Sequence, residues 1–134
     1  MILNLKPKLL VLISIICCFA GCDSINPQVQ LEKWIEQQKE QQRLPHVIDK
    51  NLKLIDIRSG EMKLIQVFEI KGLGGEMPDE KKVEIRERVV EELIAKKDQI
   101  KSLIDFGIVM TFKYQNPSKK ELYEFEIDPG KDLE

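Results

Sequence analysis

The scarcity of cysteine excludes several kinds of chemistry from most of this chain. The chain has 134 residues and three cysteines, and all three lie within the first 22 residues. Residues 23–134 therefore cannot form a disulfide framework, and they offer neither a thiolate nucleophile nor a cysteine metal site. A domain built from them must be stabilised by an apolar core alone, which is feasible for about 110 residues.

Histidine and phosphate-binding motifs are equally scarce. His46 is the only histidine, and no ligand spacing surrounds it, so we interpret it as a surface or turn residue. Gly72–Gly75 is placed as phosphate loops are, before a helix, but no Gly-Lys-Ser/Thr follows and the acids Glu76, Asp79 and Glu80 would repel a phosphate. We expect a flexible connection there, and we predict neither a metal nor a cofactor.

Charge of one sign is not in large excess. The formal net charge is −2, and removing residues 1–21 takes away Lys6 and Lys8 but no acid, so the charge becomes −4. This balance argues against binding to nucleic acid or to anionic lipid headgroups through bulk charge. Many carboxylates lie four residues from a cation, as Glu84 does from Arg88, which stabilises a helix. We therefore predict that the protein is not an enzyme.

The first 22 residues have the three parts of a secretory signal peptide. Two lysines supply the positive start, Leu9–Phe19 form an apolar run, and the small residues Ala20 and Gly21 precede Cys22. The apolar run is too short to span a membrane, which needs about 20 apolar residues.

The segment Phe19-Ala20-Gly21-Cys22 resembles the lipobox of bacterial lipoproteins, although that family usually has Leu, Val or Ile where Phe19 stands. The resemblance implies that residues 1–21 are removed and that Cys22 becomes an N-terminus carrying two or three acyl chains. Such an anchor is stable, whereas a single chain binds a membrane only marginally. Asp23 resembles the signal for retention in the inner membrane of Gram-negative bacteria. The alternatives are an uncleaved N-terminal anchor and cleavage by the ordinary signal peptidase.

After a short tether, residues 22–26, the first half of the chain predicts a helix and a hairpin. Asn26-Pro27 is typical of an N-cap followed by proline at the first helical position, and the helix is expected to continue to about residue 43. Residues 52–57 and 63–70 are rich in β-formers and flank a turn that contains Gly60, which indicates a β-hairpin.

The second half repeats this order. We expect a helix from 78 to about 103 whose core stripe comprises Val83, Val90, Leu93, Ile94, Ile100 and Ile104. Residues 108–115 and 123–127 alternate apolar with more polar side chains on either side of an Asn-Pro turn, which predicts a second hairpin.

This order favours one α+β domain spanning residues 27–128. A four-stranded antiparallel sheet with both helices packed on one face is the simplest arrangement that buries all the apolar stripes. Residues 129–134 are expected to form an acidic C-terminal tail.

The body of the chain is also similar to a loose group of small bacterial secreted proteins and lipoproteins. The similarity rests on Gly107 followed by Phe112 and Tyr114, and then on the alternating strand Tyr123–Ile127. Leu44-Pro45 followed by Ile48-Asp49 resembles the start of the first hairpin in that group. Some members carry a cysteine pair that this chain lacks, so the resemblance implies the fold and the compartment and no function.

Three residues beyond Cys22 are candidates for binding. Trp34, the only tryptophan, either anchors the first helix on the sheet or forms an exposed contact. Lys113 and Glu124 belong to the more polar face of the second hairpin, which is either a solvated face or a binding surface. An exposed edge strand could also accept a partner strand, but no residue indicates which edge.

The sequence thus predicts a lipoprotein held at the membrane by Cys22 and facing outward, in the periplasm if the cell is Gram-negative. Its leading function is a non-enzymatic interaction with an envelope protein, in assembly, inhibition or exclusion. The alternative is a carrier of a small apolar ligand between the helices and the sheet, which requires a cavity of a few hundred Å³.

Overall fold

The computed structural model describes residues 26–133. The expected signal peptide, Cys22 and most of the tether lie outside these residues. Four helices and five strands follow in the order α1 (Pro27–Gln42), β1 (His46–Asp49), β2 (Leu52–Gly60), β3 (Lys63–Ile70), α2 (Asp79–Ala95), α3 (Lys101–Phe106), β4 (Val109–Gln115), β5 (Glu121–Ile127) and α4 (Pro129–Asp132).

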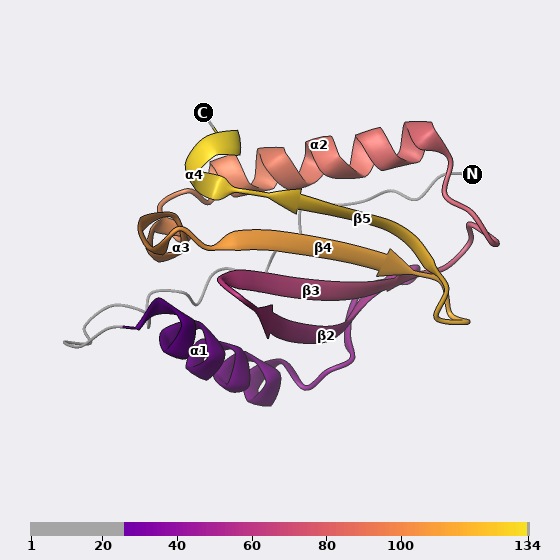
Figure 1. The fold of residues 1–134 in the computed structure, drawn as a ribbon. Helices are drawn as coiled ribbons and strands as arrows, with labels where there is room; N and C mark the ends of the chain where they lie inside the picture. Colours follow the sequence, from indigo (N-terminus) through magenta and orange to yellow (C-terminus); the bar gives the residue numbers. More distant parts are fainter. Residues whose placement is uncertain (1–25, 134) are drawn as a thin grey trace.

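The strands form one sheet in the order β1-β2-β3-β4-β5 (Figure 1). The pairs β1–β2, β2–β3 and β4–β5 are antiparallel, whereas β3 and β4 are parallel. The predicted four-stranded antiparallel sheet was therefore wrong in two respects. It omitted β1, and it did not foresee that the connection through α2 and α3 carries the chain back to the end of the sheet at which β3 began. A crossover of this kind makes the next strand parallel to the previous one.

Helix α1 begins where the sequence predicts. The Asn26 side chain accepts hydrogen bonds from the backbone N–H groups of Gln28 (3.0 Å) and Val29 (3.4 Å), and proline occupies the first turn. The Gln28 side chain in turn accepts a hydrogen bond of 2.7 Å from the backbone N–H of Met62, in the turn between β2 and β3. This contact ties the start of α1 to the sheet.

The predicted helix from 78 to 103 is interrupted. Helix α2 ends at Ala95, a turn follows, and α3 runs from Lys101 to Phe106. Gly107 caps α3 with a φ of 71°, which suits glycine. The sheet explains the break. A continuous helix would be about 38 Å long, whereas β4 with its seven residues spans about 23 Å. The break lets α3 and Ile108 return to the sheet instead of extending past it.

The buried stripe of α2 also differs from the prediction. The residues that face the core are Lys81, Ile85, Val89 and Leu93, each four residues after the last. Val83 and Ile94, which were placed on the core stripe, are 56% and 47% exposed. Apolar residues occur on two adjacent faces of this helix, so periodicity alone could not select the buried one.

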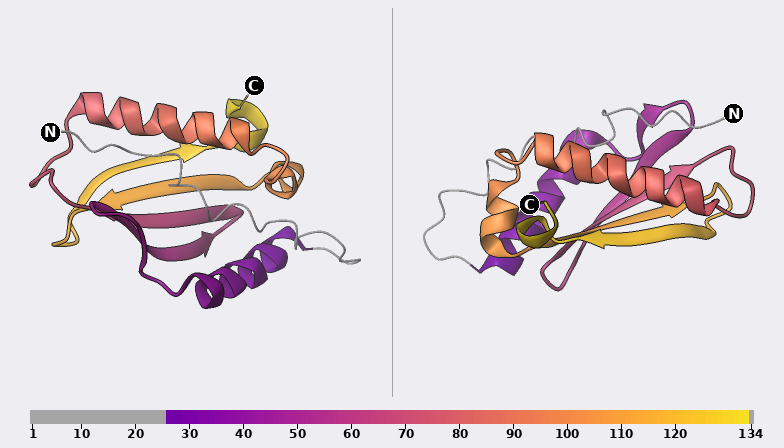
Figure 2. Two further views of the ribbon diagram at one scale, coloured as in Figure 1. Left: turned by 180° about the vertical axis from the view of Figure 1, so that it is seen from behind. Right: turned by 90° about the horizontal axis from the view of Figure 1, so that it is seen from above.

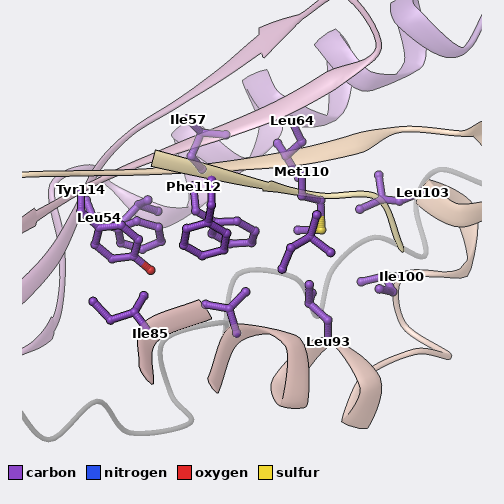
Figure 3. Packing of buried hydrophobic residues seen from close by; sticks show 14 of the residues in the cluster. Leu54, Ile57, Leu64, Ile85, Leu93, Ile100, Leu103, Met110, Phe112 and Tyr114 are labelled. Carbon is purple, nitrogen blue, oxygen red and sulfur yellow. The ribbon is translucent and has the colours of Figure 1, made fainter. Parts of the chain in front are cut away.

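The core lies on one face of the sheet. Stacked rings of Phe68, Phe112, Tyr114 and Phe125 form its centre. Ile85 and Leu93 of α2 point toward the sheet, Ile85 below the rings and Leu93 below Met110 (Figure 3). The view from above in Figure 2 shows α2 lying over this side of the sheet. All buried hydrophobic side chains of the described residues join this cluster except Val67, which lies on the opposite face of β3.

Helix α1 belongs to the same layer. Its buried residues Leu31, Trp34 and Ile35 are members of this cluster, and Figure 1 places α1 along β2 while α2 follows β5. The two helices therefore cover opposite ends of one sheet face.

Residues 129–133, which belong to the predicted acidic tail, pack against the domain instead. Asp128 caps α4 by accepting a hydrogen bond of 3.1 Å from the Gly130 N–H, and α4 packs against α3. Pro129 and Leu133 are buried, and their apolar surface explains why this end is held to the domain.

Candidate interaction surface

Trp34 occupies the core. Its side chain is 4% exposed and packs within the cluster that joins α1 to the sheet. Its indole Nε1 is buried, with no hydrogen-bond partner among the described residues. In the free domain, Trp34 therefore offers almost no surface to a partner.

Lys113 and Glu124 lie on the sheet face opposite the core. They are register partners on β4 and β5, and Lys113 Nζ is 3.8 Å from a carboxylate oxygen of Glu124. The pair is one of several on this face. Lys53 and Glu69 are 3.5 Å apart between β2 and β3.

The tightest pair on this face joins β3 to β5. Lys63 Nζ donates a hydrogen bond of 2.7 Å to Glu126, and this bond, together with the carboxylate charge, raises the pKa of Lys63. Charged side chains on the outer face thus form ion pairs with neighbouring strands, and they do not gather around a single point. We interpret this side of the sheet as a solvated face with little attraction for a small charged ligand.

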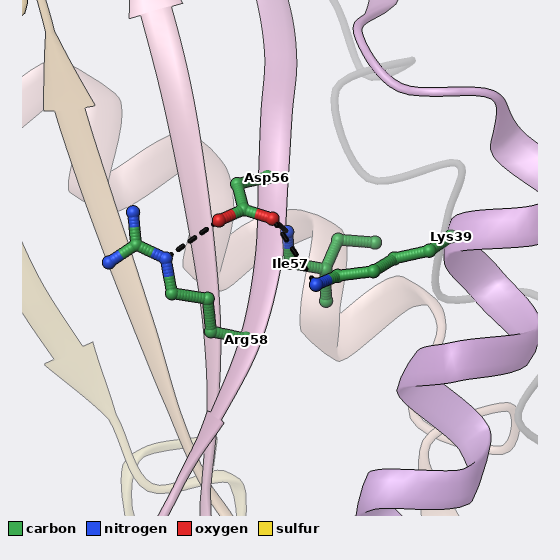
Figure 4. Close-up of polar contacts among 4 residues, drawn as sticks. All are labelled: Lys39, Asp56, Ile57 and Arg58. Carbon is green, nitrogen blue, oxygen red and sulfur yellow. Dashed lines mark hydrogen bonds and ion pairs between the residues drawn. The ribbon is translucent and has the colours of Figure 1, made fainter.

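A further polar cluster forms where β2 bulges. The register of β2 shifts between Leu54 and Asp56, and the Asp56 carboxylate accepts a 2.7 Å hydrogen bond from Arg58 (Figure 4). Lys39 reaches it from α1 at 3.5 Å. Burial alone would raise the pKa of Asp56, but the Arg58 bond, the Lys39 charge and a hydrogen bond from the Ile57 N–H together hold it below the usual value. This cluster fastens α1 to the sheet.

The two edges of the sheet differ. Strand β1 has four residues, and its pairing with β2 is irregular between Val47 and Asp49. A small hollow near the β1–β2 turn is lined by both signs of charge, with Lys50, Lys53 and Lys71 beside Asp49 and Glu69. Short length and irregular pairing are features by which proteins protect an edge from further pairing.

Strand β5 has the opposite character. It has seven residues and pairs with β4 on one side, while no strand of residues 26–133 pairs with its other side. A shallow, open hollow of about 680 Å³ lies along it, lined by residues 121–126 and by Lys82 of α2. Because six consecutive residues line this hollow, it follows the backbone edge of the strand.

Lys82 and Tyr123 contact each other in the lining of this hollow. The Lys82 ammonium lies 5.7 Å from the centre of the Tyr123 ring, a cation–π geometry, and partial burial raises the pKa of Tyr123. Sequence reasoning missed Lys82. The residue is one of many lysines on a helix, and its role depends on α2 lying beside β5.

The remaining polar motifs do not form a chemical centre. No group of three or more His, Cys, Asp and Glu side chains within residues 26–133 is arranged to hold a metal ion. His46 begins the edge strand β1. The glycine loop is tied to the β4–β5 turn, where the Asn116 side chain donates to the Gly74 carbonyl at 3.4 Å.

None of the helices in the described part of the chain is long and apolar enough to cross a membrane.

Comparison with known proteins identifies the fold. No protein family and no curated protein matches the sequence. A Pseudomonas aeruginosa protein assigned as secreted has a similar structure, with a TM-score of 0.60 and 11% identity over 81% of this chain and 97% of that protein.

Two pilotins have the same fold. EpsS of the Vibrio vulnificus type 2 secretion system gives a TM-score of 0.59 at 15% identity, over 80% of this chain and 94% of its own. AspS, the type II secretion pilotin of Vibrio cholerae, gives 0.53 at 15% identity, over 77% and 93%. At these identities the comparison establishes a shared fold.

Proposed function

We propose that this protein is a lipid-anchored, non-enzymatic interaction module of the bacterial envelope that assists the assembly of a partner protein. The observation that carries the proposal is the fold, because it covers nearly the whole length of two type II secretion pilotins. The lipobox-like segment ending at Cys22 supports a lipid anchor. Because one fold can host many functions, the surface of the domain also bears on the proposal.

The surface favours a protein partner over a small charged ligand. Charges on the outer sheet face are largely paired between strands, as Lys113 is with Glu124 and Lys63 with Glu126. The largest hollow that we describe is shallow and open, and it follows a strand edge. Small-molecule sites are usually concave and bury most of their ligand.

A carrier function remains the second candidate, because one observation favours it. The Tyr114 hydroxyl is buried between the sheet and α2, with no hydrogen-bond partner among residues 26–133. An apolar ligand with one polar group could use it. The hollow along β5, however, is open to the surface and follows the strand.

The proposal is tested by crosslinking in the membrane of the native host. A photo-reactive residue placed at Glu124 on β5, with one at Glu36 on the far helix α1 as the matched control, should give a discrete adduct only from β5. Deletion of the gene should then lower the amount or the oligomerisation of the crosslinked envelope protein. If its level and assembly are unchanged, the assembly function is wrong.

Which membrane holds the protein is a separate proposal. Asp23 predicts the inner membrane in a Gram-negative cell. Membrane fractionation of the wild type beside an Asp23→Ser variant tests it, because the variant should move to the outer membrane. Identical fractionation of the two proteins would contradict the role of Asp23.

A further inference from the structure

We propose that the free edge of β5 accepts an extended segment of a partner protein as a sixth strand, and that this segment alternates basic and apolar residues. The inference rests on the proposed interaction function and names its surface and the chemistry of its partner. Backbone hydrogen bonds along the edge would supply much of the affinity, and the alternating side chains would supply specificity.

The two edges of the sheet differ in length and regularity. Strand β1 has only four residues and its pairing with β2 is irregular, and both features disfavour the addition of a further strand. Strand β5 has seven residues, regular pairing with β4 from Tyr123 to Ile127, and an open hollow along its outer side. A strand edge of this length presents unpaired backbone groups at regular spacing, which an incoming strand can satisfy.

The core side of β5 is aromatic. Tyr123 and Phe125 share the core face with Tyr114 and Phe112, their register partners on β4. A strand added beside β5 would place alternate residues next to these rings. Aromatic residues pair favourably with apolar and β-branched neighbours across strands. Positions of the partner on this side should therefore be apolar.

The outer side of β5 is acidic. On this side, Glu124 and Glu126 are exposed, and each pairs inward with a lysine, Lys113 on β4 and Lys63 on β3. A basic residue on the added strand would continue this alternation of charge across the sheet. Opposite charges on neighbouring strands are favourable and like charges are unfavourable.

The same carboxylates argue against a second copy of this chain as the occupant. Two antiparallel β5 edges would bring Glu124 and Glu126 of one copy close to those of the other. Lys82 lies at the rim on the α2 side, where a basic residue of the partner would be repelled. The basic positions are therefore expected on the outer side of the added strand only.

The test uses the mature, lipidated protein in detergent and three eight-residue peptides. The first alternates Lys and Val, the second is the same peptide with alternate backbone nitrogens methylated, and the third replaces Lys by Glu. We expect the first peptide alone to bind in fluorescence anisotropy. It should also slow hydrogen exchange of the amides in residues 121–127 and leave those in 46–49 unchanged.

Charge-neutralising variants provide the matched comparison. Glu124→Gln with Glu126→Gln should weaken binding of the Lys-Val peptide about 3- to 10-fold, since exposed ion pairs contribute modestly. Glu36→Gln with Glu40→Gln, which removes the same charge from exposed positions on α1, should leave binding unchanged. Hydrogen exchange of the free variants checks that both remain folded.

Several outcomes would overturn the inference. Equal binding of the methylated peptide would mean attraction by charge without strand pairing. Protection at β1 instead of β5 would place the site on the wrong edge, and concentration-dependent protection of β5 without peptide would identify a second copy as the occupant. None of these results changes the effect that gene deletion is expected to have on the amount or oligomerisation of an envelope protein, so the strand-pairing inference and the assembly function can fail separately.

Discussion

At the scale of single residues, Tyr114 is the side chain that departs most from its environment. Its ring stacks with Phe68 at 5.0 Å between centres, yet its hydroxyl lies in an apolar layer and points toward α2 (Figure 3). A buried polar group without a partner costs about 1–3 kcal/mol. The Tyr114 ring therefore stabilises the fold by packing, whereas its unpaired hydroxyl lowers the free energy of unfolding.

We expect Tyr114→Phe to raise the free energy of unfolding by about 1 kcal/mol at pH 7, because it removes the unpaired hydroxyl and keeps the ring. Urea unfolding followed by circular dichroism measures the change. Tyr123→Phe is the matched control on the same face, and its partly exposed hydroxyl should matter little. A clear loss of stability in Tyr114→Phe would indicate that a water or a ligand satisfies the hydroxyl, and would strengthen the carrier alternative.

Alkaline pH gives an independent prediction for the same residue. Burial raises the pKa of Tyr114 far above its ordinary value of 10.0, so the folded state keeps the proton after the unfolded chain has lost it. The stability linked to this group is fully present below about pH 10 and decreases as the pH rises further. Between pH 9 and pH 11.5 the wild type should lose more stability than Tyr114→Phe, as measured by urea midpoints. Parallel losses would show that Tyr114 does not cause the alkaline transition.

At the scale of elements, α2 shows how a helix with two apolar faces is oriented by its surroundings. Leu93 is fully buried against the sheet, whereas its neighbour Ile94 is nearly half exposed. Both residues are large and apolar, so composition does not distinguish them. Leu93 is buried because its side of α2 faces the sheet.

The adjacent pair gives a direct test of this orientation. Leu93→Ala should lower the free energy of unfolding by about 2–5 kcal/mol, because it leaves a cavity in the core. Ile94→Ala should change it by no more than about 0.5 kcal/mol, as is usual for surface sites. Urea unfolding of the two variants under identical conditions provides the comparison. Similar losses in both would mean that α2 is rotated from the orientation described.

At the scale of the whole molecule, the domain and its anchor are separate parts. Most buried apolar side chains of the described residues form one cluster. The lipobox-like segment predicts that Cys22, which lies outside the described part of the chain, attaches this domain to the membrane.

The Cys22→Ala substitution should prevent lipidation of the protein, and it should leave the stability of the domain unchanged. Intact mass of membrane-extracted wild type should correspond to a chain that lacks residues 1–21 and carries acyl chains, and the variant should show no acyl mass. An unlipidated or uncleaved wild type would contradict the lipoprotein assignment and the assembly function built on it.

Much of the local structure follows from local sequence. The Asn26-Pro27 start of α1 and the alternation in Val109–Gln115 and Glu121–Ile127 appear in the structure as a cap and as strands with one buried face. These features depend on neighbours a few residues apart, so periodicity and capping chemistry are sufficient to predict them. Strand β1 was missed by pattern alone because four residues next to a proline carry too little periodicity. The resemblance at Leu44–Asp49 did indicate a hairpin there.

The candidate surface could be predicted only in part. The sequence located Lys113 and Glu124 on a polar face, and it raised the possibility of an open strand edge. It could not identify β5 as that edge, because edge status depends on the order of strands that are far apart in the chain. It also left two interpretations of Trp34, since burial depends on where α1 packs.

The sequence by itself therefore determined the absence of cysteine chemistry in the body of the protein, the lipobox-like segment at Cys22, and the periodic segments from which the domain is built. Only the tertiary structure decided that β3 and β4 are parallel, that the long helix breaks after Ala95, and that β5 carries the free edge. The physical reason is the distance along the chain over which the interactions act. Periodicity and caps act within a few residues, whereas strand order, helix length and burial are set by how distant segments share one sheet and one apolar layer.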